Sequence, residues 1–231
     1  MRWGMNGGNM ANDDLSDMTE SMSEVMSLGG DVQKLRAYYK DWAKTYDDDV
    51  ASHGYGLPSM MVHTVEAALT ALAGDDGRID RSVRVLDAGC GTGLIGSALC
   101  DAGFDDIHGV DLSHEMAEQA ARRSAYVTIQ SGIDLSSECP EHLRRSADIV
   151  TVGGVFTVGH IPPSALTAMA QLPVAGGLLV ISTRAAYLED TDFCDVLQGL
   201  VDGGALRLLL REEDAPYTMD SNGDYWAFEV N

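Results

Sequence analysis

A glycine-rich stretch at residues 85–93 (V-L-D-A-G-C-G-T-G) is the part of the sequence whose residue types point most directly to chemistry. It follows a short apolar run typical of a β-strand and precedes a pattern typical of a helix. Glycine permits the positive φ angles of a tight turn and has no Cβ to keep a ligand away from the backbone. The helix offers free N–H groups at its first turn. The stretch therefore predicts a ligand-binding loop at the end of a strand.

Asp87 discriminates between two classes of ligand for this loop. Gly91, Gly93 and Gly96 can be fitted to the G-x-G-x-x-G pattern of dinucleotide-binding loops, but that pattern alone is weak evidence. A carboxylate beside the loop would repel a pyrophosphate. It suits a ligand with an ammonium and a sulfonium group, such as S-adenosylmethionine (SAM). The loop also lacks the lysine of phosphate-binding loops, so charge favours SAM.

Asp111, in the stretch 109–113 (G-V-D-L-S), is a second candidate ligand-binding acid. It ends the next predicted strand, where an acidic side chain can accept hydrogen bonds from both hydroxyls of a ribose. NAD enzymes use an acid in the same way, so Asp111 indicates an adenosine-type ligand without choosing between the two cofactors. The alternative is that Asp111 only caps the following helix, although Ser113 could cap that helix itself.

The elements that must position these residues alternate along the chain. The patterns predict strands at 83–87, 107–110, 126–129, 148–152 and 178–183, and helices at 94–102, 114–122, 141–145, 164–172 and 193–201. Apolar segments at 206–210 and 225–230, joined by a turn at 220–223, predict a hairpin. The order predicts an α/β fold with a Rossmann-like, doubly wound sheet of seven strands, mostly parallel with an antiparallel C-terminal hairpin strand.

Residues upstream of the sheet are predicted to be helical. We expect an N-terminal extension at 1–30 with a short amphipathic helix at 14–28, then helices at 31–46 and 58–72. Three aspartates at 47–49 should end the helix at 31–46, because they would meet the negative end of its dipole. The chain thus divides into the extension and one domain at 31–231. Within that domain, 31–80 is a helical lid segment and 81–231 is the ligand-binding sheet core.

The charge balance limits the classes of partner. The chain has 36 acidic and 15 basic residues and a formal net charge of −21. Such a surface disfavours nucleic acid and anionic membranes and would attract a cationic small molecule. No apolar run is long enough to span a membrane, and no secretion or transit signal is present, so we expect a cytoplasmic protein, monomeric or homodimeric. The cysteines lack metal-ligand spacing, and we expect reduced thiols and no metal site.

Taken together, residues 85–93 and 109–113 resemble the two cofactor-binding motifs of class I SAM-dependent methyltransferases. The stretches 39–47 (Y-K-D-W-A-K-T-Y-D), 154–163 (G-V-F-T-V-G-H-I-P-P) and 175–178 (A-G-G-L) are similar to the small methyltransferases typified by the Williams–Beuren-region methyltransferase. The likeness covers about residues 35–231. It implies SAM as the cofactor and S-adenosylhomocysteine (SAH) as its product.

The resemblance also implies roles for individual residues. Asp87 and the loop backbone would hold the methionine part, Tyr46 would close over its carboxylate, and Gly153 to Val155 would lie beside the sulfonium. Relatives typically have Gly-Asp-Leu after the third strand, where this chain has S-G-I-D-L at 131–135. Either Asp134 contacts the adenine amino group or Ile133 packs there. The full implied SAM-binding set is Tyr46, Asp87, Gly89, Cys90, Gly91, Thr92, Gly93, Asp111, Leu112, Met116, Ile133, Asp134, Gly153 and Val155.

The implied reaction is an in-line displacement at the methyl group, which depends on positioning and on excluding water. His160, after the fourth strand, is the best candidate for a general base, and Tyr46 is a second catalytic candidate. A structural histidine bonded to its own loop is the alternative. By position, the candidate substrate-binding residues are His53, Tyr55, His160, Arg184 and Tyr187.

Three classes of function stay open. Methyl transfer to a small molecule is the first, because the acidic surface disfavours nucleic acid. Methyl transfer to a protein side chain is the second. The third is a non-catalytic SAM-binding protein or, more remotely, an NAD-binding oxidoreductase.

Overall fold

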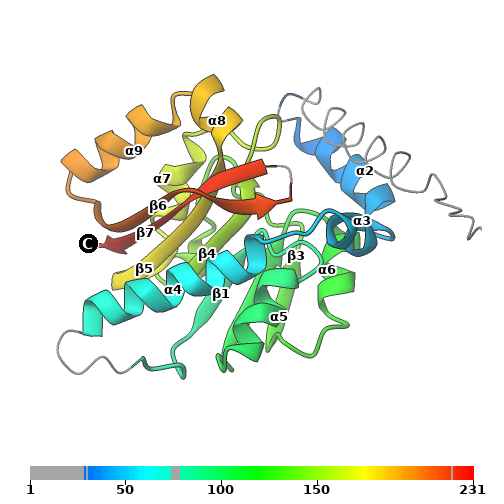
Figure 1. Cartoon of the computed structure of the whole chain (residues 1–231), viewed down its shortest axis with the longest axis horizontal. Coiled ribbons are helices and arrows are strands. Elements are labelled where there is room, and N and C mark those ends of the chain that lie inside the picture. The colour runs from blue at the N-terminus through cyan, green and yellow to red at the C-terminus, as the bar shows by residue number, and fades with distance from the viewer. Residues whose placement is uncertain (1–28, 30, 74–78, 220) are drawn as a thin grey trace, which may run out of the picture.

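A seven-stranded sheet in the order β3-β2-β1-β4-β5-β7-β6 forms the centre of the molecule (Figure 1). The structure is a computed structural model and describes residues 29, 31–73, 79–219 and 221–231. Strands β1 to β5 are mutually parallel, whereas β7 runs antiparallel to both β5 and β6, as the sequence predicts. The strands are β1 Val85–Ala88, β2 Ile107–Asp111, β3 Thr128–Ser131, β4 Ala147–Phe156, β5 Pro173–Arg184, β6 Leu206–Thr218 and β7 Ser221–Val230.

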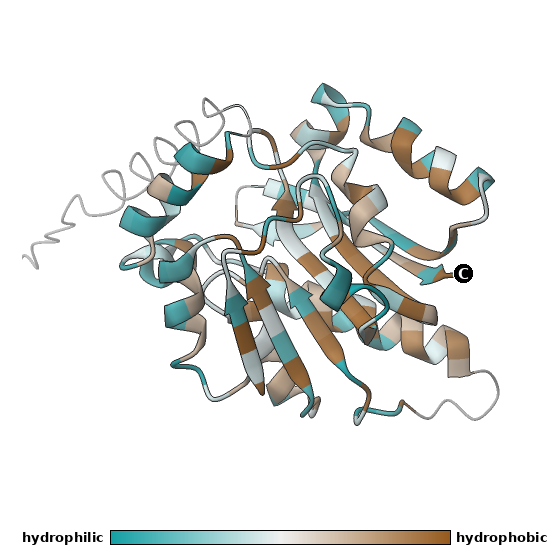
Figure 2. Ribbon diagram, turned by 180° about the vertical axis from the view of Figure 1, so that it is seen from behind, coloured by the Kyte–Doolittle hydropathy of each residue, from teal (hydrophilic) through white to brown (hydrophobic). Residues whose placement is uncertain are grey.

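Helices cover both faces of the sheet. One face carries α4 (Leu57–Ala73), α5 (Leu94–Asp101) and α6 (His114–Ala120), and the other carries α7 (Ala165–Met169), α8 (Ala185–Asp190) and α9 (Phe193–Asp202). Each face has its own apolar core between strands and helices, and Figure 2 shows apolar residues running along the central strands. The short 3₁₀ helix η2 (Glu141–Leu143) precedes β4. The sheet is therefore doubly wound.

The strand order reverses at β1. This strand pairs with β2 on one side and with β4 on the other, and its four residues are buried. The chain leaves β1 toward β2 and β3 and then crosses back to become β4. Loops diverge at such a reversal, and open α/β sheets bind ligands in the crevice that forms there. Helices α2 (Val32–Trp42) and α3 (Tyr46–Ser52) lie beside the carboxyl ends of these strands (Figure 1).

The prediction of one helix over 31–46 is wrong, since α2 ends at Trp42 and α3 begins at Tyr46. The three aspartates at 47–49 occupy the first turn of α3. There they face the positive end of a helix dipole, which stabilises them. The acidic run therefore starts a second helix as well as following the end of the first.

Other boundaries differ from expectation for physical reasons. The third strand lies at 128–131 and not at 126–129. Tyr126 instead packs against glycines of the loop and helix that follow β1 and donates to Asp87. Helix α8 was not expected. The hairpin turn predicted at 220–223 is wrong in position, because Ser221 already pairs with Thr218. The helix expected at 14–28 lies outside the described residues.

Three negative findings apply to the described part of the chain. None of its helices is both long enough and apolar enough to cross a membrane. None of its His, Cys, Asp and Glu side chains gather in a group of three or more that could hold a metal ion. Cys90, Cys100, Cys139 and Cys194 are free thiols, two of them buried.

Candidate functional site

The loop between β1 and α5 has the conformation that its glycines predict. Gly89, Gly91 and Gly93 all have positive φ angles, of 79°, 54° and 88°. A Cβ on Gly89 would lie 2.5 Å from a methyl carbon of Val155, whereas one on Gly91 would meet no atom within 4 Å. Gly91 therefore presents open backbone, and it lines the pocket described below.

Asp111, the last residue of β2, ties the glycine loop to the adjacent strand. Its Oδ2 accepts a hydrogen bond of 2.8 Å from the Gly91 N–H, and its Oδ1 accepts one of 2.7 Å from the Ser113 N–H. The Ser113 hydroxyl caps α6 by accepting from the Met116 N–H, so Asp111 is not the cap. Burial raises the pKa of Asp111, and its backbone hydrogen bonds oppose that rise. Each carboxylate oxygen has a further lone pair for a ligand hydroxyl.

Asp87 lies behind the loop and does not line the pocket. It is fully buried and accepts hydrogen bonds from the Tyr126 hydroxyl at 2.7 Å and the Thr151 hydroxyl at 3.0 Å. Burial raises its pKa from 3.8 to about 6, although these hydrogen bonds oppose the rise. Asp87, which the sequence analysis used to favour SAM over a dinucleotide, thus bonds to buried side chains beneath the glycine loop and does not face the pocket.

Tyr126 is a structural residue of this site that sequence reasoning missed. A Cβ on Gly96 would lie 2.2 Å from its ring, and Cβ atoms on Gly93 and Gly109 would lie 2.9 Å and 3.0 Å away. Glycine at position 96 therefore makes room for Tyr126, and a dinucleotide is not needed to explain it. The sequence signal that could have indicated a buried aromatic ring here is the set of glycines at 93, 96 and 109.

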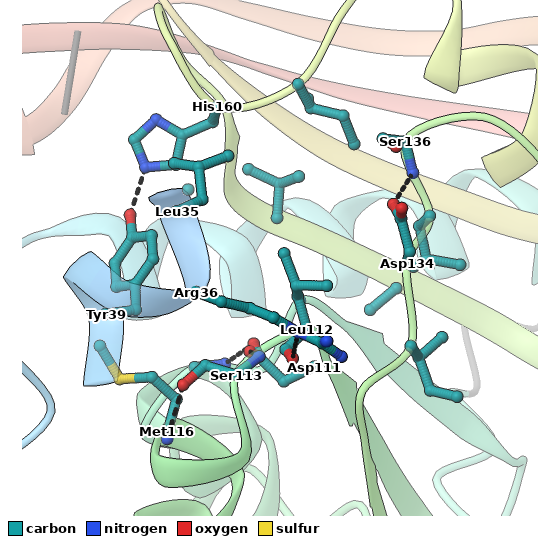
Figure 3. Close-up of a pocket in the computed structure, with 18 of the residues that line it drawn as sticks. Leu35, Arg36, Tyr39, Asp111, Leu112, Ser113, Met116, Asp134, Ser136 and His160 are labelled. Atoms are coloured by element: carbon teal, nitrogen blue, oxygen red, sulfur yellow. Dashed lines mark hydrogen bonds between the residues drawn. The ribbon is translucent and has the colours of Figure 1, made fainter. Parts of the chain in front are cut away.

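A pocket opens where the strand order reverses (Figure 3). Its walls come from β1, β2 and β4, the loop after β3, and α2. Eleven of the predicted site residues line it: Tyr46, Gly89, Gly91, Asp111, Leu112, Met116, Ile133, Asp134, Gly153, Val155 and His160. The predicted residues that do not line it are Asp87, Cys90, Thr92, Gly93, His53, Tyr55, Arg184 and Tyr187.

Helix α2 covers the pocket with residues that the sequence analysis did not assign to it. Val32, Leu35, Arg36 and Tyr39 line the pocket and recur at the spacing of one helix face. Arg36 Nε donates to the Leu112 carbonyl at 3.2 Å, holding the helix over the end of β2. The Tyr39 hydroxyl is hydrogen-bonded to His160 Nε2 on the opposite wall, as Figure 3 shows.

His160 lies in the pocket wall and also contacts its own loop. Its Nδ1 contacts the carbonyl of Val158 in that loop at 3.4 Å. Burial lowers its pKa from 6.5 to about 4, so the ring is neutral near pH 7. A carbonyl can only accept, which assigns the ring proton to Nδ1 and leaves Nε2 to accept from Tyr39.

The remaining substrate candidates lie outside the pocket. His53 is buried at the C-terminal end of α3, and its Nδ1 contacts the Asp49 carbonyl in the first turn of that helix. Tyr187 is buried and donates to the Ile161 carbonyl at 2.8 Å, which fixes the loop that carries His160. Arg184 donates to the Ser221 hydroxyl and lies 5.4 Å from the Tyr217 ring centroid. Arg184 also lines a separate hollow with Asp214 and Asn222.

Asp47 anchors the start of α3 to the glycine loop. Its Oδ1 accepts from the Thr92 hydroxyl at 2.6 Å, and its Oδ2 pairs with Arg123, whose Nε donates to the Thr92 carbonyl. Both the hydroxyl and the carbonyl of Thr92 are thus used in this link. The link places the neighbouring Tyr46 in the wall of the pocket. The centroids of the Tyr46 and Trp42 rings are 4.7 Å apart.

Comparison with known proteins agrees with this geometry. Residues 85–177 match the model of a methyltransferase domain family. Over 119 residues the chain is 34% identical to methyltransferase-like protein 27 of Homo sapiens, which is 51% of this chain and 46% of that protein. The match thus spans less than half the length of this curated relative.

Solved structures share the fold. A TehB-like SAM-dependent methyltransferase from Corynebacterium glutamicum superimposes with a TM-score of 0.58 at 22% identity, over 84% of this chain and 99% of that one. Magnesium protoporphyrin IX methyltransferase from Synechocystis PCC 6803, with SAH bound, gives a TM-score of 0.58 at 15% identity, over 87% and 100%. At these identities the likeness establishes the fold alone.

Proposed function

We propose that this chain is a class I SAM-dependent methyltransferase that transfers the methyl group of SAM to a nucleophilic atom of a small molecule. The observation that carries the proposal is the pocket at the β1/β4 reversal, which brings the open backbone of Gly91 next to the carboxylate of Asp111. Two features far apart in the sequence thus meet at the place where open α/β sheets bind ligands.

The residues present fit SAM. Asp111 has lone pairs to spare for the ribose hydroxyls. Leu112, Met116 and Ile133 supply apolar surface for the adenine ring. The Asp134 carboxylate lies in the same wall, oriented by the Ser136 N–H at 2.8 Å, and would accept from the adenine amino group (Figure 3). Both alternatives weighed for 133 and 134 can therefore act together.

Catalysis would rest on positioning and on exclusion of water. SAM supplies the electrophilic methyl group when bound. Tyr46, at the first residue of α3, and Gly153 to Val155, in β4, form the wall where the methyl group would lie. Tyr39 and His160 close the pocket above it. A covered site of this kind favours direct displacement because reactants are held in line and water is kept out.

Two features favour a small-molecule acceptor over a macromolecule: helix α2 covers the pocket, and the chain has a large negative net charge. Helix α2 is hydrogen-bonded to Leu112 and to His160 across the pocket, and this cover favours an acceptor small enough to enter beneath it. The net charge of −21 opposes a nucleic acid.

Calorimetric titration with SAM, SAH and NAD tests the proposal. We expect saturable binding of both adenosyl ligands and none of NAD. Asp111→Ala should raise the Kd of SAH at least about tenfold, because hydrogen bonds to a carboxylate contribute roughly 1.5–3 kcal/mol. Asp105→Ala, an exposed acid before the other end of β2, is the matched control and should bind as the native chain does. Binding of NAD in place of SAH would overturn the proposal.

A further inference from the structure

Two of the three aspartates in the first turn of α3 connect that helix to other elements. Asp48 is exposed, whereas Asp47 and Asp49 are half-buried. Asp49 Oδ2 accepts from Trp42 Nε1 at 2.7 Å, which joins α3 to α2. Asp47 bonds instead to the glycine loop. The acidic run therefore links α3 in two directions, to the neighbouring helix and to the core of the sheet.

The Asp47 link is a closed set of interactions among three segments. The carboxylate accepts from the buried Thr92 hydroxyl and pairs with Arg123, and Arg123 Nε donates to the Thr92 carbonyl at 2.6 Å. A Cβ on Gly93 would lie 3.1 Å from the Arg123 Cδ, so the arginine also packs closely on the loop. A lone surface ion pair contributes little, but a network of this kind fixes the geometry of its members.

Tyr46 is the pocket residue whose place depends on this link. It directly precedes Asp47 and lines the pocket, and its ring centroid is 4.7 Å from that of Trp42. The Trp42 bond to Asp49 joins α2 to α3, so it does not by itself fix either helix to the sheet. At the first turn of α3, Asp47 supplies the connection to the glycine loop. The distance between Tyr46 and that loop is therefore set by Asp47.

We propose that Asp47 is a positioning residue that acts through Tyr46 to fix the methionine end of SAM. The inference rests on the proposed function and adds a residue outside the cofactor's contacts, since Asp47 does not line the pocket. One carboxylate ties the helix that carries Tyr46 to the loop that presents Gly91. The Tyr46 hydroxyl can donate to the methionine carboxylate only at that spacing, because an O–H···O bond needs an oxygen–oxygen distance of about 2.5–3.0 Å.

SAH titration of a set of variants tests the inference. Asp47→Ala and Thr92→Val remove the same hydrogen bond from opposite sides, and each should raise the Kd of SAH about three- to tenfold. Asp48→Ala, in the same helical turn, is the matched control and should bind as the native chain does. In a Tyr46→Ala background, Asp47→Ala should change the Kd less than about twofold, because a residue that acts through Tyr46 has no effect once Tyr46 is removed.

Fluorine NMR without ligand follows Tyr46 directly. The chain is labelled with meta-fluorotyrosine, and the Tyr46 resonance is the one that disappears in Tyr46→Phe. Thr92 is distant from Tyr46 in the sequence and is connected to its neighbour Asp47. We therefore expect a larger shift or broadening of the Tyr46 resonance in Thr92→Val than in Asp48→Ala, although Asp48 is much closer along the chain.

The outcomes separate this inference from the proposed function. Native affinity in both Asp47→Ala and Thr92→Val overturns the inference. An Asp47→Ala effect of equal size with and without Tyr46 overturns it too, because Asp47 would then act on the glycine loop alone. An unchanged Tyr46 resonance in Thr92→Val does the same. Failure of the native chain to bind SAH overturns the proposed function instead, and the resonance still reports whether the link holds Tyr46.

Discussion

Asp87 and Asp111 lie near the carboxyl ends of the neighbouring strands β1 and β2, yet the structure gives them different roles. Asp111 faces the pocket, and Asp87 is enclosed by Tyr126 and Thr151 behind the glycine loop. Sequence patterns could locate both acids, because each lies near the end of a strand and within a few residues of a glycine. They could not show that Tyr126, 39 residues after Asp87, would supply its hydrogen bond. Contacts of this kind depend on packing between elements, which a local pattern does not record.

Asp87 predicts a pH dependence of stability. Its pKa is raised from 3.8 to about 6 by burial, so between these values the folded chain binds more protons than the unfolded chain. The stability that this proton contributes is fully present below about pH 3.8 and is lost as the pH rises through 6. A shift of about two units corresponds to roughly 3 kcal/mol.

Urea unfolding of the native chain and of Asp87→Asn, measured from pH 4 to pH 8, isolates this effect. The native-minus-variant difference in unfolding free energy should fall by roughly 2 kcal/mol between pH 4 and about pH 7 and then stay level. Other titrating groups cancel in the difference. A flat difference across the whole range would contradict a raised pKa for Asp87.

At the scale of elements, α2 is held over the pocket by few contacts. Leu35 is its buried residue, and its polar links to the body include Arg36 to the Leu112 carbonyl, Tyr39 to His160 and Lys40 to Glu115. Elements with few buried apolar contacts open at low free-energy cost. The dissociation rate of a ligand in the pocket would therefore depend partly on how readily α2 opens.

Arg36→Ala should weaken SAH binding by about three- to tenfold, because it removes a hydrogen bond from a charged donor at the closing edge. Calorimetric Kd values measure the effect, and the dissociation rate should account for most of it. Lys34→Ala on the same helix, whose ion partner Asp31 is 4.0 Å away at the surface, is the control. Equal affinities for both variants would mean that α2 does not close on the ligand.

The sequence predicts the strands of the sheet better than it predicts α2 and α3. Strands β1 and β2 are short, mostly apolar and bounded by turn residues, and the apolar run at 148–152 marks the first half of β4, so each is visible locally. The break at 43–45 is not, because Asp47 is stabilised by Thr92 and Arg123 from other elements. The pocket wall contributed by α2 was missed for the same reason. A helix face can be predicted from its spacing, but not the surface that it covers.

At the scale of the whole molecule, the dominant feature is the net charge of −21. Several arginines are engaged in ion pairs, among them Arg84 with Asp106, Arg123 with Asp47 and Arg211 with Asp224. With 15 basic residues against 36 acidic ones, most carboxylates have no opposite charge to match them. Such an excess destabilises the compact state through self-repulsion.

Salt should therefore stabilise the chain. Raising NaCl from about 0.05 M to about 0.5 M shortens the screening length from more than 10 Å to less than 5 Å, which reduces repulsion between exposed carboxylates. We expect the Tm to rise by several degrees, since each kcal/mol shifts the Tm of a chain of this size by about 2–4 °C. KCl should act as NaCl does at equal concentration, because screening depends on ionic strength. A Tm that stays constant or falls in both salts would show that attractive ion pairs outweigh the repulsion, in spite of the acidic excess.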